Sequence, residues 1–254
     1  MELFWEAVLL GLLQGLTEFL PISSSGHLAL GEKALGWDEP GMAFDVAVHV
    51  GSLGAVLVFV RREIVAMLTR QPRLLGLLVV ATVPAAVAGL GGAADVVDAL
   101  KRNLAAVGLC LLGTAGILAV ARKLPDRQGT AAQMGWGKAL LVGLAQVLAL
   151  LPGVSRSGST FTAGLGVGLG REEAIRFAFL MAVPAIGGAA VLTFAGGDFG
   201  TLPHGALAGG TVVSFVASLF AMKAMVAVVV RRKLGWFALY CAALGLTAIG
   251  FHFM

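Results

Sequence analysis

Residues 8–28 read VLLGLLQGLTEFLPISSSGHL, an apolar helical pattern that stops at Pro21 and a run of three serines. Proline lacks the backbone donor that a helix needs, and serine and glycine favour caps and turns. Irregular backbone at membrane depth is tolerated only where protein or a polar cavity surrounds it. If the chain lies in a membrane, we therefore predict a re-entrant helical hairpin over residues 3–30. The alternative is a full span followed by a surface loop.

A second stretch with the same pattern covers residues 136–169, where residues 140–160 read LLVGLAQVLALLPGVSRSGST. The two stretches match at a constant offset of 132 residues, as from position 11 to position 143. The matched pairs are Gly11 and Gly143, Gln14 and Gln146, Leu16 and Leu148, Ser23 and Ser155, Ser25 and Ser157, and Gly26 and Gly158. These matches predict an internal duplication, with repeats at approximately 1–125 and 136–254 in a single membrane domain.

The composition is that of a membrane protein. Apolar residues make up 58% of the 254 residues and charged residues 13%, whereas soluble proteins have about 45–50% and about 25%. The mean hydropathy is +0.93. The formal net charge of +4 comes from basic residues between apolar runs, so it indicates membrane topology and we expect no nucleic-acid partner.

Six apolar runs are long enough to span a bilayer, which takes about 20 residues. They lie at about 42–60, 74–93, 103–121, 173–195, 205–230 and 235–254. We therefore predict an all-α polytopic membrane protein with six transmembrane helices and two re-entrant helical hairpins. Each half then contains one hairpin and three spans. Because three is odd, the second half is inverted in the membrane, and the two hairpins enter from opposite faces and meet near its middle.

The basic residues give this topology a direction, because cytoplasmic loops are enriched in lysine and arginine. If the loop after the first span is cytoplasmic, that side carries Arg61, Arg62, Arg70, Arg73, Arg122, Lys123, Arg127, Lys138, Arg171, Arg176, Arg231, Arg232 and Lys233. Only Lys33, Lys101 and Arg102 then lie outside. We predict a multi-pass membrane protein with both termini and the first hairpin on the outer side.

Three ionisable residues lie in the interrupted hairpins, namely Glu18, His27 and Arg156. An ionisable group at membrane depth is costly and indicates function. If the hairpin tips meet, these residues converge with a set of polar neighbours, which are the candidates for substrate binding. The set is Gln14, Ser23, Ser24, Ser25, Gln146, Ser155, Ser157 and Gly158.

Such a site suits a phosphate group. Serine loops at helix ends offer clustered donors, and Arg156 offers a planar fork for phosphate oxygens. Glu18 would repel a diphosphate unless a divalent cation, Mg²⁺ or Ca²⁺, lies between them, so Glu18 is the expected metal ligand. His27 can act as a general acid–base or as a nucleophile, and Ser24 and Ser25 are candidate nucleophiles. The residues leave serine, histidine and water open as the attacking group.

Each of these residues also has a purely structural interpretation. Arg156 can form an ion pair with Glu18 without taking part in chemistry, and His27 can bond a loop carbonyl. The serines can cap helices. Gln14 and Gln146, which recur in both repeats, can join the hairpins to each other. His49, in a span near Asp45, is expected to be structural.

The motifs resemble those of a known family. The segments GLTEFLPISSSGH (15–27) and PGVSRSGST (152–160) look like the two signature segments of the undecaprenyl-diphosphate phosphatase family, which is also known for bacitracin resistance. FDVAVHVGSLGAVL (44–57) and FAFLMAVPAIGGA (177–189) resemble further segments of that family. The resemblance covers essentially the whole chain.

This resemblance implies that the chain hydrolyses undecaprenyl diphosphate, a polyprenyl lipid of the bilayer, and recycles the carrier for cell-wall synthesis. It implies a location in the plasma (inner) membrane, dependence on a divalent cation and an active site towards the outer face. The family's catalytic acid, histidine, arginine and serine match Glu18, His27, Arg156 and Ser24. Some members carry a further glutamate where this chain has Gln14, which leaves Glu18 as the one carboxylate for metal.

Two other functions compete with this one. A transporter or flippase for polyprenyl phosphate lipids would use the same inverted repeat, but it would not need His27 beside Glu18. Another superfamily of membrane lipid phosphatases requires a second histidine soon after the arginine, and none follows Arg156 until His204. We therefore favour the undecaprenyl-diphosphate phosphatase. The sequence leaves the prenyl chain length and the oligomeric state open, a homodimer included.

Overall fold

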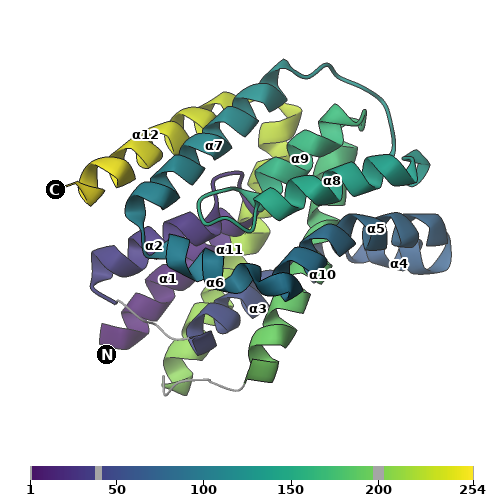
Figure 1. Cartoon of the computed structure of the whole chain (residues 1–254). Coiled ribbons are helices and arrows are strands. Elements are labelled where there is room, and N and C mark those ends of the chain that lie inside the picture. Colours follow the sequence, from purple (N-terminus) through teal and green to yellow (C-terminus); the bar gives the residue numbers. More distant parts are fainter. Residues whose placement is uncertain (1, 38–41, 197–202, 254) are drawn as a thin grey trace.

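The computed structural model describes residues 2–37, 42–196 and 203–253, and in this part of the chain it is helical without strands (Figure 1). The helices of the first half are α1 (Glu2–Phe19), α2 (Ser24–Leu35), α3 (Met42–Phe59), α4 (Arg61–Thr69), α5 (Pro72–Ala88), η1 (Gly89–Ala93), α6 (Ala94–Lys101) and α7 (Leu104–Lys123). Those that follow are η2 (Ala131–Gln133), α8 (Trp136–Leu148), α9 (Arg156–Gly166), α10 (Arg171–Gly196), α11 (His204–Val230) and α12 (Leu234–His252). The predicted all-α class is confirmed.

Five helical segments are long and apolar enough to cross a membrane, and α3 with α4 makes a sixth if that bent pair is counted as one span. The five are Pro72–Gly92, Leu104–Lys123, Arg171–Ala195, His204–Val230 and Leu234–His252. Many large apolar side chains, among them Leu90, Val191 and Trp236, are more than half exposed on the outside of the protein. Because water would not cover so much apolar surface in a stable monomer, lipid must do so.

Two of the predicted spans differ in detail from the helices. The run at 42–60 ends as α3 at Phe59, and the chain then bends by 64° into α4. The guanidinium of Arg61 folds back onto the carbonyl of Val58 at 2.7 Å, which satisfies an acceptor at the end of α3. The run at 74–93 stays regular only to the end of α5, and Gly92 within η1 adopts a φ of 93°.

The two interrupted stretches each fold as a helix, a break and a second helix that packs beside the first. Ser23 caps α2 by accepting a hydrogen bond from the amide of Gly26, and Ser155 caps α9 in the same way from Gly158. Both second helices stop near a glycine with positive φ, Gly36 at 67° and Gly168 at 105°. The hairpins are thus built alike from start to stop.

The first helix of each hairpin crosses a helix of the other half of the chain. A Cβ at Gly11 of α1 would lie 2.4 Å from the carbonyl oxygen of Gly210 in α11. A Cβ at Gly143 of α8 would lie 2.4 Å from the carbonyl oxygen of Ala81 in α5. Both contacts require a glycine, because any side chain would collide with the backbone of the partner helix. The matched glycines therefore occupy matched positions.

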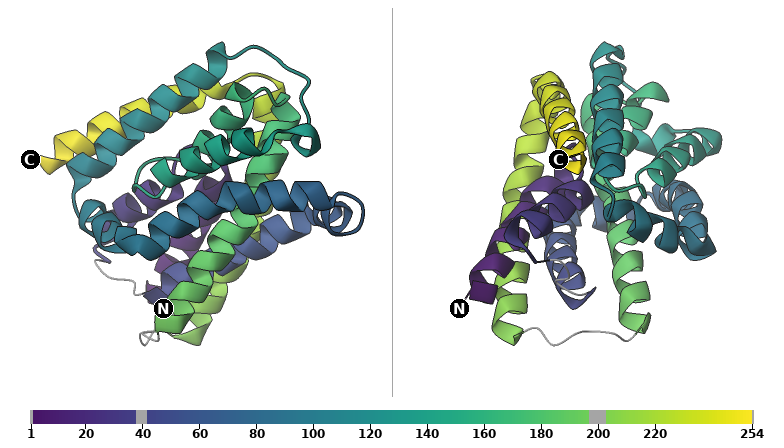
Figure 2. Two further views of the ribbon diagram at one scale, coloured as in Figure 1. Left: turned by 45° about the vertical axis from the view of Figure 1, so that its right-hand side comes forward. Right: turned by 60° about the vertical axis from the view of Figure 1, so that its left-hand side comes forward.

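Two further helices, α7 and α12, run side by side along one flank (Figure 2). They touch through glycines, since a Cβ at Gly108 would lie 2.6 Å from the carbonyl oxygen of Gly245, and one at Gly245 would lie 2.7 Å from that of Gly108. This pair contacts both breaks. Thr114 of α7 donates a hydrogen bond to the carbonyl of Gly153, and Cys241 of α12 lies 3.9 Å from the carbonyl of Pro21.

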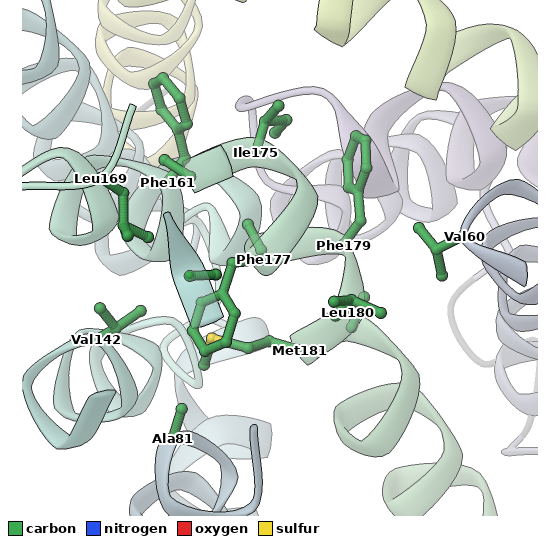
Figure 3. Packing of buried hydrophobic residues seen from close by; sticks show 14 of the residues in the cluster. Val60, Ala81, Val142, Phe161, Leu169, Ile175, Phe177, Phe179, Leu180 and Met181 are labelled. Carbon is green, nitrogen blue, oxygen red and sulfur yellow. The ribbon is translucent and has the colours of Figure 1, made fainter. Parts of the chain in front are cut away.

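The main apolar core surrounds α10 (Figure 3). Phe177 and Met181 of this helix are fully buried in one cluster with Ala81 of α5 and Val142 of α8. The same helix reaches the first hairpin, because Phe179 packs edge-on against Phe19 with ring centroids 5.7 Å apart. Because α10 touches both hairpins, it fixes the position of one relative to the other.

Several predicted cytoplasmic loops lie together at one end of the protein. Asp126, which follows α7, pairs with Arg171 at the start of α10 and with Arg232 just after α11. Arg73 at the start of α5 donates to the carbonyl of Met134 at 2.9 Å and stacks over the ring of Trp136. The contacts join segments that the sequence placed on the same side of the membrane.

Candidate active site

The two hairpins meet at the carboxylate of Glu18. One oxygen, Oε1, lies 2.6 Å from Nη2 of Arg156. The other, Oε2, accepts hydrogen bonds from the hydroxyl of Ser24 at 2.6 Å and from the amide of Gln14 at 3.0 Å. Three of these four residues come from the first hairpin and Arg156 comes from the second. The predicted convergence of Glu18, Arg156, Ser24 and Gln14 is therefore present in the structure.

The helix ends explain why the carboxylate is stable there. Glu18 lies at the carboxyl end of α1, where the helix dipole disfavours a negative charge. Ser24 and Arg156, however, are the first residues of α2 and α9, so two helix amino ends face it. The Glu18 side chain is 7% exposed and that of Arg156 is 13% exposed. Removing one partner of a buried ion pair leaves an uncompensated charge and costs about 3–5 kcal/mol.

The remaining serines mostly satisfy backbone groups. Ser23 and Ser25 lie 3.3 Å apart, and Ser155 and Ser157 lie 3.2 Å apart, measured between their hydroxyl oxygens. Ser157 also donates to the carbonyl of Leu20 at 3.0 Å, which fastens the second hairpin to the break of the first. Ser23 and Ser155 are helix caps, and the Ser155 cap occupies the amide of Gly158. The structure thus gives each of these candidate binding residues a structural contact.

His27 lies one turn into α2 and is 6% exposed. Its Nδ1 is 2.7 Å from the carbonyl oxygen of Ser23, and its Nε2 is 2.8 Å from the hydroxyl of Tyr240. Ser23 has a φ of 69°, which is unusual for a residue other than glycine, and its carbonyl also accepts a hydrogen bond from the backbone amide of His27 at 3.2 Å. His27 therefore belongs to the same hairpin turn as Ser24 without contacting Glu18.

The match to a family model decides which family this constellation belongs to. The model described as bacitracin resistance protein BacA covers residues 7–247 of the chain. The chain belongs to the BacA family. This is the undecaprenyl-diphosphate phosphatase family, so the resemblance seen in the two signature segments is confirmed. In this BacA protein the two segments are the two hairpin turns that meet at Glu18.

The buried amides distinguish the two halves of this BacA protein. Gln14 donates to Glu18, but its Oε1 has no hydrogen-bond partner among the described residues. Gln146 is 2% exposed and neither amide atom has a partner there. At the offset of 132 residues, Leu150 stands where Glu18 stands in the first half, which explains the missing partner. Buried polar atoms without partners are rare and indicate bound water or ligand.

The oxygen atoms around Glu18 fit a hard divalent cation. The described residues contain no group of three or more histidine, cysteine, aspartate or glutamate side chains that could hold a metal ion. Mg²⁺, however, commonly binds through one or two protein oxygens and substrate phosphates. The carboxylate of Glu18 and the unpartnered Oε1 of Gln14 supply such oxygens. The donor set of this BacA protein therefore fits the cation that the sequence predicts.

Sequence reasoning missed two residues that contact the site. Tyr240 bonds His27, and Thr114 holds the second break by donating to Gly153 and accepting from the amide of Ser155. The sequence features that could have indicated them are the single tyrosine and a threonine, each within an apolar span. His49 bonds the carbonyl of Asp45 at 2.6 Å, as its structural interpretation predicts.

Proposed function

We propose that this chain hydrolyses undecaprenyl diphosphate to undecaprenyl phosphate and inorganic phosphate, which returns the lipid carrier to cell-wall synthesis. The observation that carries the proposal is the contact of Glu18 with both Ser24 and Arg156, each at 2.6 Å. It joins a hydroxyl, a carboxylate base and a phosphate-binding cation, which are the parts that phosphoryl transfer to a serine requires. Membership of the BacA family supports the same reaction.

In the proposed reaction Arg156 binds oxygens of the terminal phosphate and Ser24 attacks its phosphorus. A bond forms between Oγ of Ser24 and the phosphorus while the hydroxyl proton passes to Oε2 of Glu18. The bond from the phosphorus to the bridging oxygen breaks, and undecaprenyl phosphate leaves. Water then attacks the phosphorus of the phosphoserine and passes a proton to a base. The bond between the phosphorus and Oγ breaks, inorganic phosphate leaves, and Oγ takes back the proton held on Oε2 of Glu18. His27 is the remaining group suited to proton exchange with the leaving oxygen or this water.

A divalent cation, Mg²⁺ or Ca²⁺, is part of the proposal. Glu18 and the Oε1 atom of Gln14 would hold it together with the substrate phosphates. When bound, it would neutralise phosphate charge and stabilise the negative charge that develops during transfer. The residues around it have separate tasks: Arg156 orients the phosphate, and the ring of Phe19, 5.9 Å from the guanidinium carbon, supports Arg156 from the apolar core.

We also propose the membrane arrangement that the sequence predicts, with two re-entrant hairpins, an inverted repeat and the site towards the outer face. Its support is reciprocal packing: α1 of the first half lies on α11 of the second, and α8 of the second lies on α5 of the first. The matched residues Gly11 and Gly143 mark these two crossings. The arginines joined through Asp126 lie at the end assigned to the cytoplasm.

The test is phosphate release from a short prenyl diphosphate by the detergent-purified protein, with Mg²⁺ or Ca²⁺ and with EDTA. We expect metal-dependent turnover that falls by about 10²–10⁴-fold in Glu18→Gln, Ser24→Ala and Arg156→Gln. Glu172→Gln and Arg176→Gln are matched controls. These two residues form an exposed ion pair, 3.7 Å apart, that lies away from the site. A folded protein without turnover on any prenyl diphosphate contradicts the proposal and favours lipid transport.

A further inference from the structure

The only tyrosine of the chain lies against the candidate acid–base residue. Tyr240 projects from α12, far from α2 in the sequence, and its ring stacks on that of His27 with centroids 5.6 Å apart and planes 14° apart. The next residue, Cys241, is fully buried and lies 3.9 Å from the carbonyl of Pro21. Two successive residues of α12 therefore contact the first hairpin turn, and the half-exposed phenol of Tyr240 is held there by its hydrogen bond to His27 and by the stacked rings.

The hydrogen bonds define where the imidazole carries its protons. The carbonyl of Ser23 can only accept, so Nδ1 of His27 must donate to it in both the neutral and the charged form. The proton that His27 exchanges is therefore the one on Nε2. In the neutral form Nε2 accepts from the hydroxyl of Tyr240, and in the charged form it donates to that oxygen.

We propose that Tyr240 is a positioning residue that orients the ring of His27 and sets the basicity of Nε2, while the carbonyl of Ser23 keeps the proton on Nδ1. As a catalytic role this rests on the proposed phosphatase function, whereas the contact itself can be tested without turnover. No charged side chain in the described part of the chain forms a hydrogen bond or ion pair with His27. On the helices packed against α2, Glu18 is paired with Arg156, and Lys101 and Cys110 do not bond the imidazole. The phenol is therefore the polar side chain that acts on Nε2.

Because the chain contains one tyrosine, growth on 3-fluorotyrosine changes the acidity of this phenol alone. A more acidic phenol is a better donor to neutral Nε2 and a poorer acceptor from protonated Nε2. Both effects favour the neutral imidazole, provided that the phenol itself stays protonated. The titration midpoint of His27, followed by ¹⁵N NMR of histidine-labelled protein, should move to lower pH. The signal is assigned by its loss in His27→Gln.

The matched control is Tyr240→Phe grown on the same fluorotyrosine, which keeps the stacked ring but contains no phenol. Its His27 midpoint should not respond to the label, and its kcat should fall roughly 3- to 10-fold, the effect of one neutral hydrogen bond, with KM unchanged. In the active protein, the limb of the pH–rate profile that belongs to His27 should move with the NMR midpoint. This holds whether His27 acts as acid or as base.

Two results would overturn the inference. One is a His27 midpoint that stays the same with tyrosine and with fluorotyrosine at position 240. The other is an equal shift in Tyr240→Phe, which would trace the effect to something other than the phenol. If the midpoint moves but the wild-type protein releases no phosphate from prenyl diphosphates, the positioning contact stands and the proposed phosphatase function fails.

Discussion

The first hairpin consists of α1 and α2, and the second consists of α8 and α9. In both hairpins the second helix begins and ends in the same way. Ser23 and Ser155 cap the amino ends, and Gly36 and Gly168, also 132 residues apart, follow the carboxyl ends with positive φ. The residues that carry charge do not match. At the same offset Glu18 corresponds to Leu150, Ser24 to Arg156 and His27 to Ser159.

This difference shows which residues the hairpin backbone needs and which residues the chemistry needs. The serine caps and glycines are the same in both because both hairpins must satisfy helix ends and pack closely. The first hairpin supplies the carboxylate, the hydroxyl and the imidazole, and the second supplies the guanidinium. Neither hairpin contains a complete site, so the site exists only where the two meet.

The largest expected effect comes from replacing His27 of the first hairpin with serine, the residue at the matching position of the second hairpin. His27→Ser should lower phosphate release from a prenyl diphosphate by about 10²–10⁴-fold, because a serine cannot exchange a proton near neutral pH. The matched control is Ser159→Ala, whose hydroxyl has no hydrogen-bond partner in the described structure. It should leave turnover within about threefold. Full activity in His27→Ser would remove the imidazole from the mechanism.

A smaller effect is expected from the feature that the hairpins share. Gly11→Ala and Gly143→Ala each place a Cβ 2.4 Å from a carbonyl oxygen of the partner helix. Each should destabilise the protein by about 1–3 kcal/mol, measured by thermal unfolding in detergent. Gly116→Ala, in α7 with no atom within 4 Å of the added Cβ, serves as the control and should be neutral or slightly stabilising. Sensitivity at only one of the two positions would contradict equivalent crossings.

The smallest expected effect is on stability, and it comes from a difference between the carboxyl-terminal parts of α2 and α9. Burial raises the pKa of Glu32 to about 7, nearby Asp45 adds to this rise and Lys101 opposes it. Its counterpart Gly164 instead packs against Ala174. Because the pKa in the folded protein exceeds the ordinary value of 4.5, Glu32 favours the folded state most below that pH, and this contribution is lost as the pH rises through 7.

Glu32→Gln mimics the protonated acid at every pH. It should therefore raise the melting temperature relative to the wild type at pH 8 and leave it almost unchanged at pH 4, below the ordinary pKa of the carboxyl. Glu172→Gln, at an exposed position, should show no such pH dependence. A stabilisation that is equal at both pH values would mean that the carboxyl of Glu32 titrates as it does in the unfolded chain.

The sequence predicted the parts of the site that depend on local pattern. Interrupted apolar runs predicted both breaks, and the cost of charge at membrane depth singled out Glu18 and Arg156. The lack of a partner for Gln146 was not predicted, although Leu150 stands at the position that matches Glu18. Tyr240 was not predictable. Its contact with His27 depends on how α12 packs against the first hairpin, and an apolar helix carries no sequence signal for that neighbour.

The central claim is that Glu18 and Arg156 form one site from two hairpins, and a double-mutant cycle on kcat/KM tests it most directly. The variants are Glu18→Gln, Arg156→Gln and the double variant, assayed with a prenyl diphosphate and Mg²⁺. If the two residues act as a unit, the double variant should lose no more activity than the worse single variant. Losses that simply multiply would show that the two side chains act independently, which contradicts a single shared site.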